Sequence, residues 1–393
     1  MLDERLQFIE ECKSQEWSIA EVCRRFEISR KTGYKWLDRY ETGGIDALQD
    51  GSHAPHHNPR QVLEEVEDAI VEARGQHPHW GPVKLRAWLQ RTEPEIDWPA
   101  ASTMGEILRR HGLAVPRKKR LKAPANTQPL QHAQGANRVW CADFKGWFRC
   151  ADGTRCDPLT ITDGYSRFLL RCQAAKHPDV WYTKPLFEAT FREYGLPEYI
   201  RTDNGAPFAS VGIGGLSELS VWWIKLGIRP DRIQPGKPAQ NGRHERMHRT
   251  LKQETAQPPR RNLREQQNAF DLFRQEYNHQ RPHQALQGRT PSECYQASLR
   301  PYPSRLREVV YPTEFDIRYV SEGGQMRWNG AKVFVGRALI GEPLGLQPIG
   351  DGVWKVWFSF YELGVFHEVP LVIRPCPSSP PHADRKDQKP HAT

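Results

Sequence analysis

Two histidines and a glutamate stand at the spacing of a metal-binding helix in the stretch NGRHERMHRTLK, residues 241–252. His244 and His248 are four residues apart, so on a helix they share one face and could both reach a zinc ion. Glu245 between them could then act as general base on a metal-bound water, as in H-E-x-x-H metalloproteases. Zinc-dependent peptide hydrolysis is therefore one hypothesis.

The surroundings of this stretch disfavour zinc. No third ligand follows at the metzincin spacing, although distant acids such as Glu265 and Glu276 remain open as ligands. Cationic side chains crowd the same helix and disfavour a divalent cation on their face; they are Arg243, Arg246, Arg249 and Lys252. Glu245 could therefore act on a zinc-bound water or have another role, and other parts of the sequence must distinguish these two hypotheses.

The composition describes a basic, globular chain. Of 393 residues, 38% are hydrophobic and 26% are charged, which predicts about two to four folded domains. The formal net charge of +9 indicates an acidic partner such as nucleic acid, with a solvated basic face as the alternative. Residues 134–300 carry this excess, +8, whereas residues 1–133 are neutral. The eight cysteines form no C-x-x-C pair and are expected to be small, reduced, buried side chains.

Residues 1–52 are predicted to form a helix-turn-helix domain. Ser18 and Glu21 make a capping box that begins one helix, and Ser29 is the expected N-cap of the next. The first residues of such a second helix meet base edges in the major groove, and later basic residues meet phosphates. The candidate DNA contacts of this helix are Arg30, Lys31, Tyr34, Lys35 and Arg39. An ordinary three-helix domain with a basic face is the alternative.

Residues 61–115 predict a second helical domain, of helix-turn-helix or winged type. GPVKLRAWLQ and STMGEILRRHGL have helical patterns, with Thr103 and Glu106 as a capping pair and Gly112 beyond the end. Residues 116–133 form a basic, proline-containing linker. Three of its side chains could follow a DNA backbone or simply keep a linker soluble; they are Lys118, Lys119 and Arg120.

Residues 134–300 predict an α/β core. RVWCADFKGWF, the turn signal ADGT and PLTITDGYSRFLLRCQAA predict three strands, and VWYTKPLFEATFREYG predicts an amphipathic helix. PEYIRTDNG adds a strand that ends in an acidic turn. Residues 301–374 show short strands between glycine turns and predict a small antiparallel β-barrel. Residues 375–393 have the composition of a disordered tail.

Three acids of this core lie on separate elements that could bring them together. Asp143 lies in the first strand, Asp203 at the end of a later strand, and Glu245 on the helix of the opening stretch. Carboxylates suit Mg²⁺, a hard cation that prefers oxygen ligands. Two such ions about 3.5–4 Å apart can activate the attacking oxygen and stabilise the leaving oxygen at phosphorus. The cationic side chains that disfavour zinc binding, including Arg243, would instead favour the binding of a polyanionic nucleic-acid backbone beside the site.

Motifs around these acids resemble those of a known family. TDNG at 202–205 and NGRHERMHRTLK at 241–252, preceded by VWCADFKG at 139–146, resemble the acidic triad of the DDE integrase core. Retroviral integrases and bacterial insertion-sequence transposases share this core. EYNHQRPHQALQGRTPSECY resembles the segment that closes the domain in insertion-sequence transposases, and the N-terminal helices fit the same proteins. The resemblance implies a central ribonuclease H-like fold between all-α helix-turn-helix domains and the β-barrel.

The resemblance also implies roles for particular residues. Asp143, Asp203 and Glu245 would be catalytic and would bind two Mg²⁺ or Mn²⁺ ions per active site, with Asp143 bridging them. Arg249 and Lys252, one and two turns after Glu245, would face DNA phosphates. His244 and His248 would then be accidental neighbours of Glu245 that touch DNA at most.

Other motif positions have weaker implications. Asn204 and Asn241 would shape the site, and Asp163 in TDGYSR has a turn-forming role as the alternative to a metal role. The interval of 42 positions from Asp203 to Glu245 is longer than in many of these transposases. VGIGGLS at 211–217 is the expected inserted loop, with a role that the sequence leaves open.

The protein expected from these patterns is a transposase that binds element DNA ends, hydrolyses a phosphodiester to expose a 3′-hydroxyl and joins it to target DNA. Because two ends must be joined, we expect a homo-oligomer assembled on DNA, and an ATPase partner for target selection remains open. No apolar run approaches about 18 residues and no secretory pattern begins the chain, so we expect a cytoplasmic, nucleoid-associated protein without membrane contact. The alternatives are a DNA-binding regulator with an inactive core and the H-E-x-x-H zinc protease.

Overall fold

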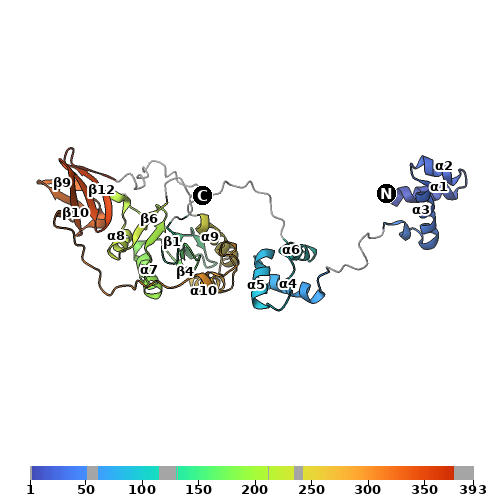
Figure 1. The fold of residues 1–393 in the computed structure, drawn as a ribbon, viewed down its shortest axis with the longest axis horizontal. Coiled ribbons are helices and arrows are strands. Elements are labelled where there is room, and N and C mark those ends of the chain that lie inside the picture. Colours follow the sequence, from blue (N-terminus) through green and yellow to red (C-terminus); the bar gives the residue numbers. More distant parts are fainter. Residues whose placement is uncertain are drawn as a thin grey trace. The chain divides into compact units, whose positions relative to one another are not determined.

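The computed structural model describes residues 2–50, 61–114, 130, 132–210, 212–233 and 242–375, except the side chain of Arg243. The chain forms two compact units, residues 1–63 and 64–393 (Figure 1). The predicted contacts Lys118, Lys119 and Arg120, and all of the predicted tail beyond Pro375, lie outside the described residues. Among the described helices, none combines the length and apolar character needed to cross a bilayer.

The first unit contains the helices that the sequence predicted for the helix-turn-helix domain. Its helices are α1 (Leu2–Lys13), α2 (Ile19–Arg25) and α3 (Arg30–Gly43). Ser18 caps α2, because its Oγ accepts a hydrogen bond from the Glu21 amide (3.4 Å) and donates to the Glu21 carboxylate (2.9 Å). Ser29 caps α3 by accepting a hydrogen bond from the Thr32 amide (3.1 Å). The capping signals therefore fixed both helix starts correctly.

Three helices open the second unit: α4 (Glu64–Gln76), α5 (Pro82–Thr92) and α6 (Ala101–Arg110). The predicted Thr103–Glu106 capping pair is wrong, because α6 already begins at Ala101 and both residues lie within it. Glu106 instead accepts a hydrogen bond from Arg109 (2.9 Å). Gly112, with a φ of +70°, follows the helix end as predicted.

A six-stranded mixed sheet forms the centre of the second unit, in agreement with the predicted α/β core. Its strands are β1 (Val139–Phe144), β2 (Phe148–Arg149), β3 (Arg155–Asp163), β4 (Leu169–Ala175), β5 (Tyr199–Thr202) and β6 (Arg229–Arg232). β1 lies between antiparallel β3 and parallel β5. β4 pairs with β3, and β6 continues the parallel half beyond β5.

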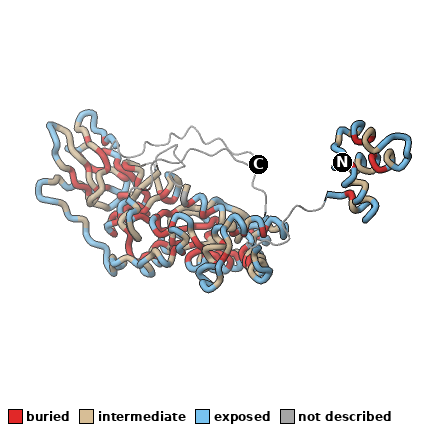
Figure 2. The backbone as a smooth tube through the Cα atoms, turned by 45° about the vertical axis from the view of Figure 1, so that its right-hand side comes forward, coloured by how far each residue is buried: buried red, intermediate tan, exposed pale blue. Residues whose placement is uncertain are grey.

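Helices pack on both faces of this sheet through two apolar clusters. Figure 2 shows buried residues gathered in the interior of this part of the chain. The helices are α7 (Val180–Tyr194), α8 (Glu218–Lys225), α9 (Gly242–Thr255), α10 (Leu263–His279) and the short α11 (Pro291–Cys294). Leu159 and Ile161 of β3 pack with the aromatic core around α7 and α8. Because side chains alternate along a strand, Thr160 and Thr162 point to the opposite face, where α9 lies.

The C-terminal part is all β, but the predicted closed barrel is not confirmed. The strands are β7 (Asp316–Tyr319), β8 (Gln325–Trp328), β9 (Ala331–Phe334), β10 (Pro343–Gly350), β11 (Val353–Phe358), β12 (Tyr361–His367) and β13 (Val372–Pro375). Five of them form an open sheet in the order β13-β12-β11-β10-β7, and β8 pairs with β9 as a separate hairpin. In the described part of the chain, β7 and β13 remain edges because no pairing joins them.

The inserted loop at 211–217 contacts this C-terminal β structure. The Ile213 amide donates to the Val335 carbonyl (3.0 Å), and Leu216 belongs to the apolar core of the C-terminal strands. An ion pair between Lys225 and Glu342 (2.6 Å) lies in the same interface. The loop therefore joins the central sheet to the last domain, a role that its sequence alone did not indicate.

Candidate active site

Strand register brings Asp143 and Asp203 to neighbouring positions at one end of the sheet. The parallel strands β1 and β5 pair Val139 with Tyr199 and Cys141 with Arg201. If this pairing is extended by two positions, Asp143 lies opposite Asp203, which is the first residue after the end of β5. Asp143 is directed to the α9 side of the sheet, since the preceding Ala142 packs into the α7/α8 core.

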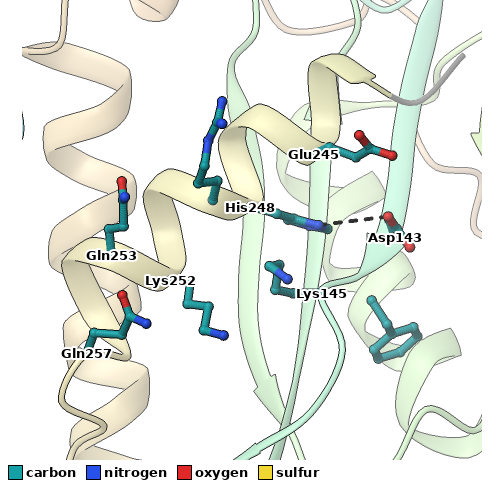
Figure 3. Close-up of a pocket in the computed structure, with 9 residues that line it drawn as sticks. Asp143, Lys145, Glu245, His248, Lys252, Gln253 and Gln257 are labelled. Atoms are coloured by element: carbon teal, nitrogen blue, oxygen red, sulfur yellow. Dashed lines mark ion pairs between the residues drawn. The ribbon is translucent and has the colours of Figure 1, made fainter. Parts of the chain in front are cut away.

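Asp143 and Glu245 line one pocket of about 510 Å³ between β1 and α9. Figure 3 shows both carboxylates directed into the same space. Three cationic side chains share the lining: Lys145, Arg249 and Lys252. The remaining lining residues are Phe144, His248, Gln253 and Gln257. The pocket therefore combines two acidic side chains with three cationic ones.

The helical period of α9 separates its polar and buried faces. Met247 and Leu251 are buried against α10, whereas Glu245, Arg249 and Lys252 are exposed. Residues three and four apart lie above one another on a helix, so the acid and the two bases form one solvent-facing row. This row is the one that the sequence predicted to face a polyanionic substrate.

Asp203 is partly buried and is not among the residues that line this pocket. Its Oδ1 accepts a hydrogen bond from the Gly205 amide (3.1 Å). Burial raises the pKa of Asp203 above its usual value, and the Gly205 hydrogen bond opposes that shift. Asn204 Nδ2 donates to the Ile233 carbonyl (2.9 Å) and so ties the acidic turn to the end of β6. Asn241 lies outside the described residues.

His244 and His248 are not accidental neighbours exposed to DNA, as the sequence analysis supposed. They are 3% and 4% exposed, and each Nε2 lies 2.6 Å from the hydroxyl of Thr160 on β3. Burial lowers the pKa of His244 to about 3, and burial together with neighbouring His244 lowers the pKa of His248 well below its usual value. Both rings are therefore neutral and fix α9 against the sheet. The four-residue spacing of His244 and His248, which suggested a zinc site, brings both rings to Thr160.

Family models match the same parts of the chain. Models of the integrase core domain match residues 133–238 and 226–291. Helix-turn-helix and homeodomain-like models match residues 4–56 and 32–108. A model of the C-terminal domain of IS481 family transposases matches residues 315–367. Together these matches support an insertion-sequence transposase with an integrase core. The predicted helix-turn-helix and ribonuclease H-like regions of the transposase are thus confirmed.

Proteins of insertion elements are among the relatives of the transposase. It is 27% identical to an uncharacterized 31.7 kDa protein of insertion element IS407 from Burkholderia multivorans, over 57% of this chain and 78% of that protein. It is 25% identical to an uncharacterized 39.2 kDa protein of insertion element IS476 from Xanthomonas euvesicatoria, over 63% of this chain and 68% of that protein.

Solved structures of integrases are more distant. The catalytic core domain of HTLV-2 integrase in complex with magnesium shares 17% identity and a TM-score of 0.33, over 42% of this chain and 99% of that one. A chain of the simian T-cell lymphotropic virus intasome in complex with a PP2A regulatory subunit shares 18% identity and a TM-score of 0.37, over 78% and 99%.

The zinc-protease alternative finds little support in the transposase. One described group has metal-ligating atoms within 4.8 Å of one another, namely Asp143, His244 and His248. The Thr160 hydroxyl, however, occupies the point on which the two imidazoles converge. Zinc would need both nitrogens at about 2.0–2.1 Å, a position that the Thr160 hydroxyl already fills. The histidines are better explained as a buried hydrogen-bonded network.

Removal of the Thr160 hydroxyl should therefore destabilise the transposase. Thr160→Val keeps the shape of the side chain but leaves imidazole nitrogens buried without a partner, at a cost of about 2 kcal/mol in the free energy of unfolding. Thr160→Ser keeps the hydroxyl and should cost only the lost methyl, about 0.8 kcal/mol. Urea unfolding of the three proteins measures this difference. Equal midpoints for Thr160→Val and the parent protein would contradict the network.

Asp163 has the turn-forming role that the sequence offered as its alternative. It is 1% exposed, and its carboxylate accepts hydrogen bonds from the amides of Asn137 (2.8 Å) and Ser166 (2.7 Å). The Ser166 hydroxyl donates a further bond of 2.6 Å to it. Burial raises the pKa of Asp163, and these donors oppose the shift. Asp163 thus holds the β3–β4 turn and offers no free oxygen to a metal.

The DNA contacts predicted on α3 are accessible to solvent. The exposed ones are Arg30, Lys31, Tyr34 and Lys35, and Arg39 is half-buried. Since Gly33 on the opposite face is buried, the basic face of α3 is the one that is free for a ligand. Their contact with DNA stays a prediction.

The residues that were missed from sequence include Lys145 and Thr160. Lys145 lines the pocket because it lies two positions after Asp143, and alternation along the strand could have found it. Thr160 had no sequence signal, since its contact with α9 depends on the register of β3 against β1.

Proposed function

We propose that this transposase binds the DNA ends of its own element, hydrolyses a phosphodiester there to free a 3′-hydroxyl, and joins that hydroxyl to target DNA. The observation that carries the proposal is the single pocket in which Asp143 and Glu245 lie beside Lys145, Arg249 and Lys252. Carboxylates suit divalent cations, and lysine and arginine suit phosphates, so the pocket has both halves of a site for phosphoryl transfer.

Asp143, Asp203 and Glu245 would hold two Mg²⁺ or Mn²⁺ ions. The donor set fits, because all three ligands are carboxylates, whereas the Nε2 atoms of the nearby His244 and His248 are engaged by Thr160. Burial raises the pKa of Asp203, and an adjacent cation would oppose that shift by favouring the charged form. When bound, such ions would activate the attacking oxygen and stabilise the leaving oxygen of an in-line displacement.

The cationic side chains of the pocket would position the strands. Lys145, Arg249 and Lys252 would bind phosphates on either side of the reacting bond and hold attacking oxygen, phosphorus and leaving oxygen in line. In the first reaction a water oxygen bonds to phosphorus and the 3′-oxygen leaves as a hydroxyl. In the second, that hydroxyl bonds to a target phosphorus, its proton is released, and the 3′-oxygen of the target strand leaves.

End recognition would come from the N-terminal helices. The exposed start of α3 would enter the major groove, and a homo-oligomer would hold two ends together. We retain the six segments 1–52, 61–115, 116–133, 134–300, 301–374 and 375–393 as the proposed domain organisation, and a cytoplasmic, nucleoid-associated location. An ATPase partner is left out of the proposal because nothing in the described residues points to one.

The proposal is tested by strand transfer from an oligonucleotide copy of the element's flanking end. With Mg²⁺ or Mn²⁺ we expect the end to become covalently joined to a target duplex, and no joining with chelator or with a scrambled end. Denaturing gels resolve the joined product from the substrate. Specific binding without joining would instead favour a DNA-binding regulator with an inactive core. Absence of both would argue against a role in end joining.

A further inference from the structure

An exposed tryptophan lies next to the proposed active site. Trp147, between β1 and β2, has 55% of its surface exposed. The guanidinium groups of Arg149 and Arg155 lie 5.7 Å and 5.2 Å from the centre of its indole. An indole costs free energy when it is left in water, so an exposed one framed by two cations is a candidate contact for a ligand.

The hairpin of β2 and β3 fixes this arrangement. Arg149 pairs with Arg155 across the two strands, and Trp147 precedes Arg149 by two positions. Side chains two apart lie on one face of a strand, so the indole and both guanidinium groups share the outer face. Phe148 and Cys156 fill the opposite, inner face and pack into the core around α10. The tryptophan is thus held outward by the packing beneath it.

The surface around Trp147 is continuous with the proposed active site. Trp147, Lys145 and Lys252 line a small cavity of about 140 Å³. Lys145 and Lys252 also line the pocket of Asp143 and Glu245, where Figure 3 shows them. A strand whose phosphates follow these two lysines would bring its next nucleotide to the indole.

The charge around Trp147 selects a nucleic acid over a protein partner. Arg149, Arg155, Lys145 and Lys252 surround it with positive charge. Asp157, which accepts hydrogen bonds from Arg155 (2.6 and 3.1 Å), is only 3% exposed. Cations that frame an aromatic face are the combination with which proteins bind phosphates and stack bases of single strands.

We propose that Trp147 stacks on a base of the element end that is displaced from its pair beside the reacting phosphodiester, while Arg149 and Arg155 bind the adjoining phosphates. This inference rests on the proposed function. A duplex hides the faces of its bases, so an indole can stack only on a terminal or unpaired one. Stacking then offsets the cost of unpairing and frees the strand to enter the pocket.

Unpaired substrates test the stacking role. On a fully paired end, Trp147→Ala should slow strand transfer by about 5- to 150-fold, the loss expected for one base–aromatic stack. Trp147→Phe should retain most of the rate. On an end whose terminal nucleotides are already unpaired, Trp147→Ala should approach the parent rate, because unpairing is no longer required. Trp181→Ala, which removes a tryptophan that is 90% exposed on α7, is the matched control and should behave as the parent protein.

A crosslink locates the contact independently of catalysis. Ends that carry 5-iododeoxyuridine at successive terminal positions are irradiated in complex with the protein, and the attached peptide is identified by mass spectrometry. Attachment at Trp147, lost in Trp147→Ala and kept in Trp181→Ala, supports the inference. Attachment elsewhere, or equal rates for Trp147→Ala and the parent protein on paired ends, overturns it. If the parent protein joins no ends at all, the proposed function has failed instead.

Discussion

Glu245→Gln is expected to lower strand transfer by more than about 100-fold while end binding is preserved. Loss of a residue that only supports a metal ligand typically costs 10–100-fold, and loss of a ligand itself should cost more. The glutamine keeps the length of the side chain but carries no charge for a cation. Because Glu245 is exposed on α9, the substitution leaves the packing of Met247 and Leu251 unchanged.

Strand transfer and end binding are measured in parallel for each variant. Glu322→Gln, at an exposed turn of the C-terminal part, is the matched control and should keep full activity. Asp143→Asn should abolish both hydrolysis and joining, and Asp203→Asn should do the same if Asp203 completes the site. Retained strand transfer in Asp143→Asn would refute the proposed triad. A loss of end binding in Glu245→Gln would show that the helix contributes to affinity rather than to the reaction.

Local signals explain why much of the fold could be predicted. Ser18 and Ser29 are caps whose hydrogen bonds reach only three residues along the chain, so the sequence contains the whole interaction. The turn at 151–154 and the strands around it depend likewise on neighbours. Thr103 shows the limit, because a capping pattern does not begin a helix where the preceding residues already continue it.

The site was predictable only as far as single elements allowed. Asp143 and Glu245 were chosen by type and spacing, and the structure brings them to one pocket. Thr160 was not found, because its contact with His244 and His248 joins positions more than 80 residues apart. The same reason hid the docking of the loop around Ile213 onto the C-terminal strands. These features depend on contacts between residues that are far apart in the chain, and a single sequence does not reveal such contacts.

Recognition of the element ends should depend on the start of α3. If Arg30 and Lys31 contact base edges in the major groove, the double variant Arg30→Ala, Lys31→Ala should weaken binding to the cognate end by about 100-fold or more. Binding to a scrambled duplex should change far less. Ser29, which caps α3, is unchanged, so the helix itself should persist. Fluorescence anisotropy with cognate and scrambled duplexes at several salt concentrations measures both affinities.

Arg39, farther along α3, serves as the control, because we expect it to contact a phosphate and not a base. As a phosphate contact, its replacement by alanine should weaken cognate and scrambled binding equally and lower the slope of log affinity against log salt by about one. A double variant that loses both affinities in the same proportion would make Arg30 and Lys31 backbone contacts as well. Specificity would then have to come from another part of the chain, such as the second predicted DNA-binding domain at 61–115. Only a selective loss on the cognate end assigns base reading to α3.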